Sequence, residues 1–202
     1  MGLGDAYTRL VQVLAVGNLM AEEVERQGDT SHKHHWRGML PTVRTLANLT
    51  ASEDPRMLQA VLDAGVLPEL NKCLMGLASK RLKKEACWLV SMVAAGEPQQ
   101  RELLVKHDML ATLVFLIEYA EYDVVMEACF AFTNFLHGAT PEQIKCVSSA
   151  CRRVRADGHT DHPLGRRWEC AARWWWTWSA SSRCATVWSR ATPTCCSGYS
   201  GG

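Results

Sequence analysis

The sequence predicts an all-helical protein made of stacked repeats, extending from about Tyr7 to Val147. Apolar residues recur at steps of three and four along several segments, which is the period of an amphipathic α-helix. No segment shows the sustained alternation of polar and apolar residues that marks a β-strand. A set of landmark residues also recurs at an offset of 42, the distance from Glu85 to Glu127, and such a fixed offset is typical of a repeat architecture.

The clearest copies are residues 83–96 and 124–138. The run Glu85-Ala86-Cys87-Trp88 in the first copy aligns with Glu127-Ala128-Cys129-Phe130 in the second. Gly96 aligns with Gly138 at the same offset, and each glycine stands where a helix is expected to stop. These two segments therefore predict equivalent helices in successive repeats.

Each repeat is predicted to contain three helices. In the first unit they span residues 55–64, 66–77 and 81–95, and in the second 98–107, 109–120 and 123–137. Pro55 and Pro98 each open a short first helix, where the missing N–H leaves no hydrogen bond unmade. A three-helix unit of about 40–47 residues is the signature of HEAT and armadillo arrays, which stack into a superhelical solenoid with a concave surface.

The amino-terminal region fits the repeat less well. Residues 11–20 and 42–51 both resemble late-repeat helices, but only 30 positions separate Asn18 from Asn48, too few for a full unit. The intervening stretch 21–38 is polar and contains His32-Lys33-His34-His35. Adjacent histidines can bind a metal, but without a cysteine or carboxylate cluster they are more typical of a solvated loop. Residues 1–37 are thus predicted to be a degenerate partial repeat with a polar loop, and residues 38–147 the armadillo repeats.

The carboxy-terminal region, residues 148–202, departs from the pattern. Residues 141–147 resemble another first helix, but residues 151–202 then hold six of the eight tryptophans and five of the nine cysteines. The run Arg173-Trp174-Trp175-Trp176 has no amphipathic period. Because Trp, Arg, Cys, Ala, Ser and Gly are what G+C-rich codons encode out of frame, one hypothesis is a frameshifted, disordered tail. The alternative is a genuine novel carboxy terminus.

Charge and motif content exclude several functional classes. Residues 1–150 carry 14 Lys and Arg against 18 Asp and Glu, a net of −4, whereas residues 151–202 carry 8 against 3, a net of +5. The acidic part would repel nucleic acid. The longest nearly apolar run, residues 109–117, is far shorter than the roughly 20 residues of a membrane helix. No nucleophile motif, phosphate loop or Cys-x-x-Cys pair supports an enzyme, a metal site or a cofactor, and the cysteines fit reduced thiols in the cytoplasm or nucleus.

Several motifs resemble those of one known family, importin alpha. They cover residues 40–147 with their order and spacing kept, and they match the late repeats of that family, which include its minor site for nuclear localisation signals. The matching segments are Thr42-Val43-Arg44-Thr45-Leu46-Ala47-Asn48-Leu49, Ala60-Val61-Leu62-Asp63-Ala64-Gly65-Val66-Leu67-Pro68, Lys84-Glu85-Ala86-Cys87-Trp88 with Met92 and Ala94-Ala95-Gly96, Glu127-Ala128-Cys129-Phe130 with Asn134, and Gly138-Ala139-Thr140-Pro141-Glu142-Gln143-Ile144-Lys145.

The resemblance implies a nuclear import adaptor that binds extended basic peptides along the third helices of its repeats. A Trp at position i and an Asn at i+4 share one helix face, so successive third helices form two parallel ladders. The Asn amide would bond the peptide backbone, and the indole face would attract Lys or Arg. An acidic residue three positions before each aromatic lies on the same face. The implied binding residues are Arg44, Asn48, Glu85, Trp88, Glu127, Phe130 and Asn134, with Leu14 and Asn18 as a degenerate rung.

The sequence departs from the family pattern at two rungs. Met92 replaces an amide with a thioether, and Phe130 binds a cation less well than Trp. The resemblance implies basic nuclear localisation signal peptides as partners, and both cytoplasm and nucleus as locations. The family's basic importin-beta-binding segment has no counterpart here, which argues against that partner. The plainer alternatives are that Trp88 and Phe130 are core aromatics, that the asparagines are exposed helix-end residues and the glutamates solvated charges, and that the chain is a generic armadillo scaffold or an inactive fragment.

Overall fold

The computed structural model describes residues 3–27, 38–52, 54–76 and 78–156. Within these ranges the chain forms helices and connecting turns, without β-strands. The helices are α1 (Leu3–Arg26), α2 (Met39–Thr50), α3 (Pro55–Asp63), α4 (Val66–Met75), α5 (Lys80–Ala95), α6 (Pro98–Lys106), α7 (Met109–Tyr119), α8 (Tyr122–Gly138) and α9 (Pro141–Ala156). The predicted bounds of the six helices between Pro55 and Gly138 agree with the observed ones to within two residues.

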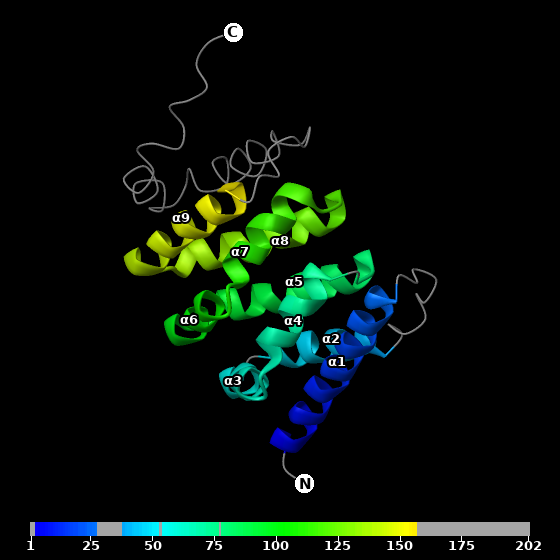
Figure 1. Ribbon diagram of the computed structural model, residues 1–202. Coiled ribbons are helices and arrows are strands. Elements are labelled where there is room, and N and C mark those ends of the chain that lie inside the picture. Colours follow the sequence, from blue (N-terminus) through cyan, green and yellow to red (C-terminus); the bar gives the residue numbers. More distant parts are fainter. Residues whose placement is uncertain (1–2, 28–37, 53, 77, 157–202) are drawn as a thin grey trace.

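The helices stack as repeats of three. Helices α3, α4 and α5 form one unit, and α6, α7 and α8 form the next. The third helices α2, α5 and α8 pack in succession, with the most extensive contact between α5 and α8. Figure 1 shows α3, α6 and α9 along one edge of the stack and α2, α5 and α8 toward the other. The predicted all-helical repeat stack is therefore confirmed for the described residues.

One continuous apolar core runs through the stack. Its largest fully buried side chains include Leu14 of α1, Leu46 of α2, Leu89 of α5 and Phe135 of α8. Because each unit has an apolar face that it cannot bury alone, the core forms only when neighbouring units are in contact. The core thus holds the helices that carry the candidate site at fixed spacing.

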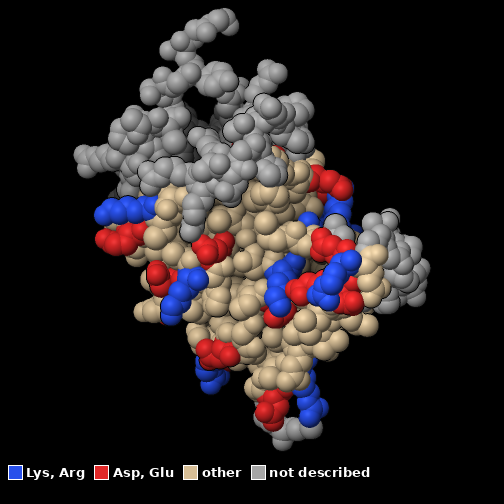
Figure 2. Space-filling view, viewed as in Figure 1, with Lys and Arg blue, Asp and Glu red and all other residues tan. Residues whose placement is uncertain are grey.

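Charged side chains of both signs are scattered over the visible face of the molecule (Figure 2). Figure 2 shows acidic and basic residues lying beside one another on this face instead of forming separate fields. Among the described residues, no helix is both long and apolar enough to span a membrane. The same residues contain no cluster of His, Cys, Asp or Glu suited to a metal ion.

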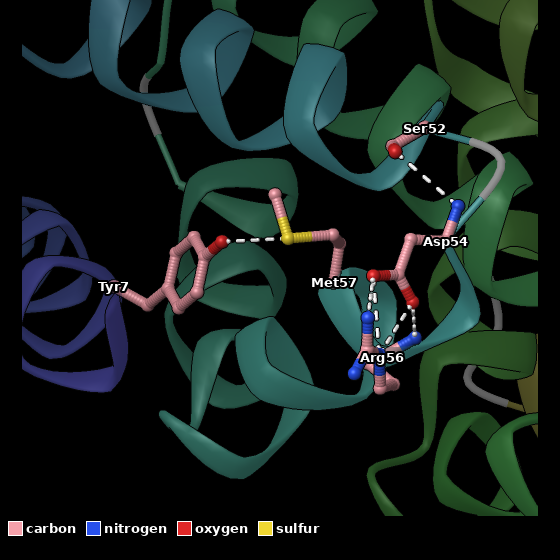
Figure 3. Close-up of polar contacts among 5 residues, drawn as sticks. All are labelled: Tyr7, Ser52, Asp54, Arg56 and Met57. Carbon is pink, nitrogen blue, oxygen red and sulfur yellow. Dashed lines mark hydrogen bonds and ion pairs between the residues drawn. The ribbon is translucent and has the colours of Figure 1, made fainter. Parts of the chain in front are cut away.

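Local side-chain bonds define where the short first helices begin. Asp54 precedes Pro55, and its carboxylate accepts a bond of 2.9 Å from the backbone N–H of Arg56 (Figure 3). This is the expected role of an N-cap aspartate, which satisfies one of the free N–H groups at a helix start. At the equivalent start of α6, Gln100 bonds back to the backbone N–H of Glu97 at 3.0 Å, and the Glu97 side chain accepts from the Gln100 backbone.

The turns between first and second helices repeat an unusual backbone conformation. Gly65 has φ 80°, and Asp108, at the matching position of the next unit, has φ 54°. The left-handed region is open to glycine and disfavoured for most other residues, although aspartate tolerates it better than most. The same turn is therefore used in both units, with glycine in one and aspartate in the other.

Helix α1 differs from its prediction in length and in position. It extends from Leu3 to Arg26, so residues 21–26, expected to be loop, are helical. It packs against α2, α3 and α4, and the Tyr7 hydroxyl donates to the Met57 sulfur of α3 at 3.0 Å (Figure 3). The α1–α4 contact resembles the α4–α7 contact between second helices. Helix α1 is thus a second helix, not the third helix that a Leu14–Asn18 rung requires.

Helix α9 continues past the boundary placed at Val147. It extends to Ala156, and Val147, Ala150 and Val154 are buried against the core. These residues follow each other at three- and four-residue steps, the period of a helix with one apolar face. The expected end at Val147 was too early, because the change in composition near residue 148 does not interrupt this spacing. The histidine cluster 32–35 and the tail 157–202, with its frameshift hypothesis, lie outside the described residues.

A close approach of α1 and α2 at Gly17 gives a test of this packing. A β-carbon at residue 17 would lie 2.5 Å from Cγ of the buried Met39. We expect Gly17→Ala to lower the free energy of unfolding by up to about 2 kcal/mol, because overpacking costs roughly 1–3 kcal/mol and the helix-propensity gain offsets only about 1 kcal/mol of it. Urea denaturation measures the change.

Gly4→Ala is the matched control, since a β-carbon there meets nothing within 4 Å. It should leave stability unchanged or slightly higher. A Gly17→Ala protein as stable as the control variant would show that α1 and α2 do not approach this closely.

Candidate functional site

The seven predicted binding residues all lie on the three stacked third helices. Arg44 and Asn48 belong to α2, Glu85 and Trp88 to α5, and Glu127, Phe130 and Asn134 to α8. Because α5 packs against both α2 and α8, the three helices form one surface, named here the third-helix face. The repeat offset places Trp88 and Phe130 at equivalent positions on neighbouring helices.

The two aromatic side chains differ in exposure. Phe130 is 54% exposed, while Trp88 is half-buried and packs against the edge of the core. The alternative that both are core aromatics therefore fails for Phe130 and holds in part for Trp88. The exposed phenyl ring and the partly exposed indole each supply apolar surface on which the aliphatic stem of a long side chain can rest.

Two further exposed side chains on α8 were not singled out in the sequence. Tyr122 and Met126 are 66% and 41% exposed, and they precede Phe130 at four-residue steps. Residues at i, i+4 and i+8 lie along one face of a helix, so these three side chains form a stripe. Their spacing was visible in the sequence, but it did not show whether an apolar stripe faces the core or solvent.

The carboxylate predicted to meet a peptide cation on α5 is already paired. Arg44 of α2 donates to Glu85 through its terminal guanidinium nitrogen and through Nε, the latter at 3.1 Å from Oε1. The hydrogen bond to Glu85 is also the main reason that the pKa of Arg44 is raised. Glu85 has a side-chain exposure of only 15%, whereas Arg44 is more than half exposed. Arg44 therefore covers the carboxylate that a basic ligand would use.

A second ion pair joins the starts of α5 and α8. Lys80 lies 2.6 Å from Asp123 and 3.2 Å from Glu121, and its hydrogen bond lowers the pKa of Asp123. Glu127, by contrast, forms no hydrogen bond or ion pair with any other described residue. Helices α5 and α8 carry three carboxylates: Glu85, Asp123 and Glu127. Because Glu85 and Asp123 are paired, Glu127 is the one available to an external cation.

The two predicted ladder asparagines have different environments. Asn134 donates to the backbone carbonyl of Ser91 at 3.2 Å, which links α8 to α5. This bond uses one of its two N–H groups and leaves the amide oxygen without a partner among the described residues. Asn48 is exposed, two residues before the end of α2. Asn48 therefore matches the plainer alternative of an exposed helix-end residue. Asn134 is partly buried, and its hydrogen bond joins α8 to α5.

The degenerate rung at Leu14 and Asn18 was a wrong prediction. Leu14 is fully buried and Asn18 is 2% exposed. The Asn18 amide donates to the Glu69 carbonyl at 3.0 Å and to the Glu69 carboxylate at 2.7 Å, and it accepts from the Cys73 thiol at 3.2 Å. All these partners lie on α4, so Asn18 connects two second helices and faces no ligand.

Equivalent polar bonds join other neighbouring units. Gln100 donates to Gln59 at 3.2 Å, Thr112 donates to Asn71 at 2.6 Å, and Gln143 donates to Glu102 at 3.1 Å. Each pair is 41 residues apart. The 41-residue spacing is visible in the sequence. It did not predict these hydrogen bonds, because helix patterns are recognised from apolar residues and these residues are polar.

The cysteines near this face have no catalytic character. Burial raises the pKa of Cys87 to about 12 and that of Cys129 to about 11. A thiol with such a pKa stays protonated near neutral pH, where the thiolate would be the nucleophile. Four cysteines of the described ranges are free thiols: Cys73, Cys87, Cys129 and Cys146.

Comparison with known proteins supports both the fold and the sequence resemblance. No protein-family model matches the chain. The chain is 33% identical over 83 residues to importin subunit alpha-1a of Oryza sativa subsp. japonica, and 34% identical over 120 residues to importin subunit alpha-1b of the same species. These matches cover 41% and 59% of the chain but only 16% and 22% of the rice proteins.

Solved structures with a similar fold are armadillo-repeat proteins. A designed armadillo-repeat protein in complex with the peptide (KR)4 is 27% identical, with a TM-score of 0.53 over 73% of this chain and 63% of that one. A computationally designed armadillo-repeat protein for modular peptide recognition gives a TM-score of 0.55 at 24% identity, covering 84% of this chain and 72% of that one. The described fold is therefore an armadillo-repeat solenoid. The chain is thus similar to importin alpha subunits in sequence and to designed armadillo-repeat proteins in fold.

The buried polar bonds of Asn18 offer a test that separates structure from binding. We expect Asn18→Ala to lower the free energy of unfolding by about 1–3 kcal/mol, because the Glu69 carboxylate and Cys73 thiol would lose a buried partner. Urea denaturation measures this loss, and Gln12→Ala, on the exposed side of α1, is the matched control. An Asn18→Ala protein as stable as the control would contradict the assignment of Asn18 to the α1–α4 contact.

Proposed function

We propose that this chain acts as an import-adaptor-like binding protein that holds basic nuclear localisation signal peptides on the third-helix face. The observation that carries the proposal is the exposed ring of Phe130 on α8, with half-buried Trp88 at the equivalent position of the neighbouring α5. Glu127 of α8 adds a carboxylate that has no ion-pair partner among the described residues. This combination suits an extended peptide with Lys or Arg side chains. It requires no catalytic group, so the proposed role is binding and not an enzymatic reaction.

The similar proteins support a peptide as the partner. The sequence relatives are importin alpha subunits, and one structural neighbour was solved with a peptide of alternating lysine and arginine. Such a peptide is extended and cationic, which matches the chemistry of the third-helix face. By the same relationship, we propose that the chain occurs in both cytoplasm and nucleus, while importin beta is not proposed as a partner.

In the proposed mode, the aliphatic stem of a Lys or Arg lies against Phe130 or Trp88, and its charged end reaches Glu127. Each cation–π contact contributes roughly 0.5–2 kcal/mol. The Asn134 amide oxygen can accept a bond from the peptide backbone, whereas Met92 offers only a weak acceptor at the equivalent position of α5. Two aromatic contacts and one free carboxylate predict weak binding with the main contribution at α8.

The pairing of Arg44 with Glu85 favours a second candidate function. With that carboxylate occupied, the α2–α5 part of the third-helix face offers less attraction to a basic ligand. A generic armadillo scaffold, whose partner contacts chiefly the exposed stripe Tyr122, Met126 and Phe130, fits this arrangement. The identity of the ligand distinguishes the two functions, because a scaffold of this second kind would show no preference for basic peptides.

Titration with the peptide (KR)4 tests the proposed function. We expect Phe130→Ala to weaken binding by about two- to thirtyfold, the loss of one cation–π contact of roughly 0.5–2 kcal/mol. Glu127→Gln should also weaken binding and reduce its dependence on salt, because it removes the free carboxylate. Fluorescence anisotropy with a labelled peptide measures both changes.

Met75→Ala is the matched control, since Met75 is an exposed apolar residue on α4 outside the third-helix face. It should bind like the unmodified protein. Equal affinity of the unmodified protein for (KR)4 and for an uncharged peptide of the same length would reject the basic-peptide function and leave the scaffold.

The Arg44–Glu85 pair gives an independent prediction with the opposite sign. We expect Arg44→Ala to strengthen binding of (KR)4 by up to about fivefold, since exposed ion pairs contribute about 0–1 kcal/mol and the freed Glu85 can pair with the peptide. The double variant Arg44→Ala with Glu85→Gln should lose this gain. Weaker binding by Arg44→Ala alone would mean that Arg44 contacts the peptide directly.

A further inference from the structure

An apolar seam runs along the exposed side of α1. Val13, Val16 and Met20 are 44%, 55% and 47% exposed, although valine and methionine usually lie inside. Arg9 precedes them and Glu23 follows them on the same line, and both are exposed. The five positions, 9, 13, 16, 20 and 23, alternate steps of four and three. This is the a/d spacing by which one helix packs along another, and these five residues are named here the α1 seam.

The α1 seam matches the side of a second helix that contacts the second helix of the preceding unit. Asn18 reaches forward from α1 to Glu69 and Cys73 of α4. In the same way Asn71 of α4 accepts from Thr112 of the next second helix, α7, and donates to the carbonyl of His107 at the end of α6. When Asn18 is matched to Asn71, Val16 falls at the position of Glu69 and Met20 at that of Cys73. The seam therefore continues an interface already used inside the stack.

We propose that the α1 seam binds a second copy of this chain, with the two α1 helices antiparallel about a two-fold axis. The residue numbers of opposed positions then sum to 32 or 33. Arg9 faces Glu23 of the second copy, Val13 faces Met20 of the second copy, and the two Val16 side chains meet at the axis. Each end of the seam thus gains an ion pair, and the apolar centre is covered.

The order of charges along the α1 seam favours a second copy of the chain with its α1 helix antiparallel. A parallel pair of α1 helices would place Arg9 against Arg9 and Glu23 against Glu23, which is repulsive. In the antiparallel pair each Arg9 faces a Glu23 of the other copy, so both ends of the contact are attractive. Such a two-fold contact uses the same surface on both copies and therefore forms a dimer and no larger assembly. Glu23 is bonded to Arg26 within its own chain, but both side chains are at least half exposed, so this bond is readily exchanged.

The contact is independent of the proposed peptide binding. Helix α1 packs against α2, α3 and α4, whereas the third-helix face is formed by α2, α5 and α8. No residue of the α1 seam is among the seven candidate binding residues. A dimer can therefore exist whether or not the third-helix face binds basic peptides.

Sedimentation equilibrium of the full chain, from low micromolar to several hundred micromolar, tests the contact. We expect a reversible monomer–dimer equilibrium, and we expect Val16→Glu to weaken it by at least about tenfold, since it places two like charges at the axis. Met75→Glu is the matched control, because Met75 is equally exposed on α4 outside the seam, and it should dimerise normally. Thermal melts followed by circular dichroism verify that both variants remain folded.

A charge exchange tests the antiparallel register without changing the apolar centre. Arg9→Glu and Glu23→Arg should each weaken the dimer severalfold, and the double variant should restore it, because opposite charges then face each other again. Three results would overturn the proposal: a monomer throughout the concentration range, a dimer unaffected by Val16→Glu, or a double variant no tighter than either single variant. Open-ended oligomers would likewise exclude it, since they indicate head-to-tail stacking.

Discussion

The packing of each third helix between its neighbours is the constraint on which the structure depends. Helix α5 lies between α2 and α8, and its Cys87, Leu89 and Val90 are fully buried. At the equivalent position of α8, Cys129 is only half-buried. A third helix with a third helix on each side, such as α5, thus buries its cysteine more completely than α8 does. In a solenoid the contacts between neighbouring units contribute as much to stability as those within a unit, so each helix position is defined by what lies beside it.

The same stacking builds the candidate site. Because α2, α5 and α8 follow each other at a regular offset, side chains at equivalent positions share one face and can act together on an extended ligand. The offset also brings groups of the protein itself into contact: Arg44 reaches Glu85, and Asn134 reaches the Ser91 carbonyl. The third-helix face is therefore partly satisfied internally. On α8, by contrast, Phe130 is exposed and Glu127 is unpaired among the described residues.

Polar residues make a second, less visible set of connections. The pairs Gln59–Gln100, Asn71–Thr112 and Glu102–Gln143 repeat at 41 residues and join neighbouring units along the first and second helices. Hydrogen bonds are directional, whereas apolar contacts are not, so such bonds favour one register between units. Asn18 belongs to this set, since it connects α1 to α4. Asparagine, which we propose to contact a peptide backbone at residue 134, thus joins two second helices at residue 18.

The sequence alone determined the helical repeat, its offset and most helix bounds, because the apolar period, Pro55 and Pro98 at helix starts and Gly96 at a helix end are local signals. It also determined which helices carry the candidate residues. Only the tertiary structure decided that α1 is a second helix with Asn18 buried and that Glu85 is neutralised by Arg44. These outcomes depend on which side of a helix meets a neighbour some 40–50 residues away. The spacing of residues within one helix carries no information about that neighbour.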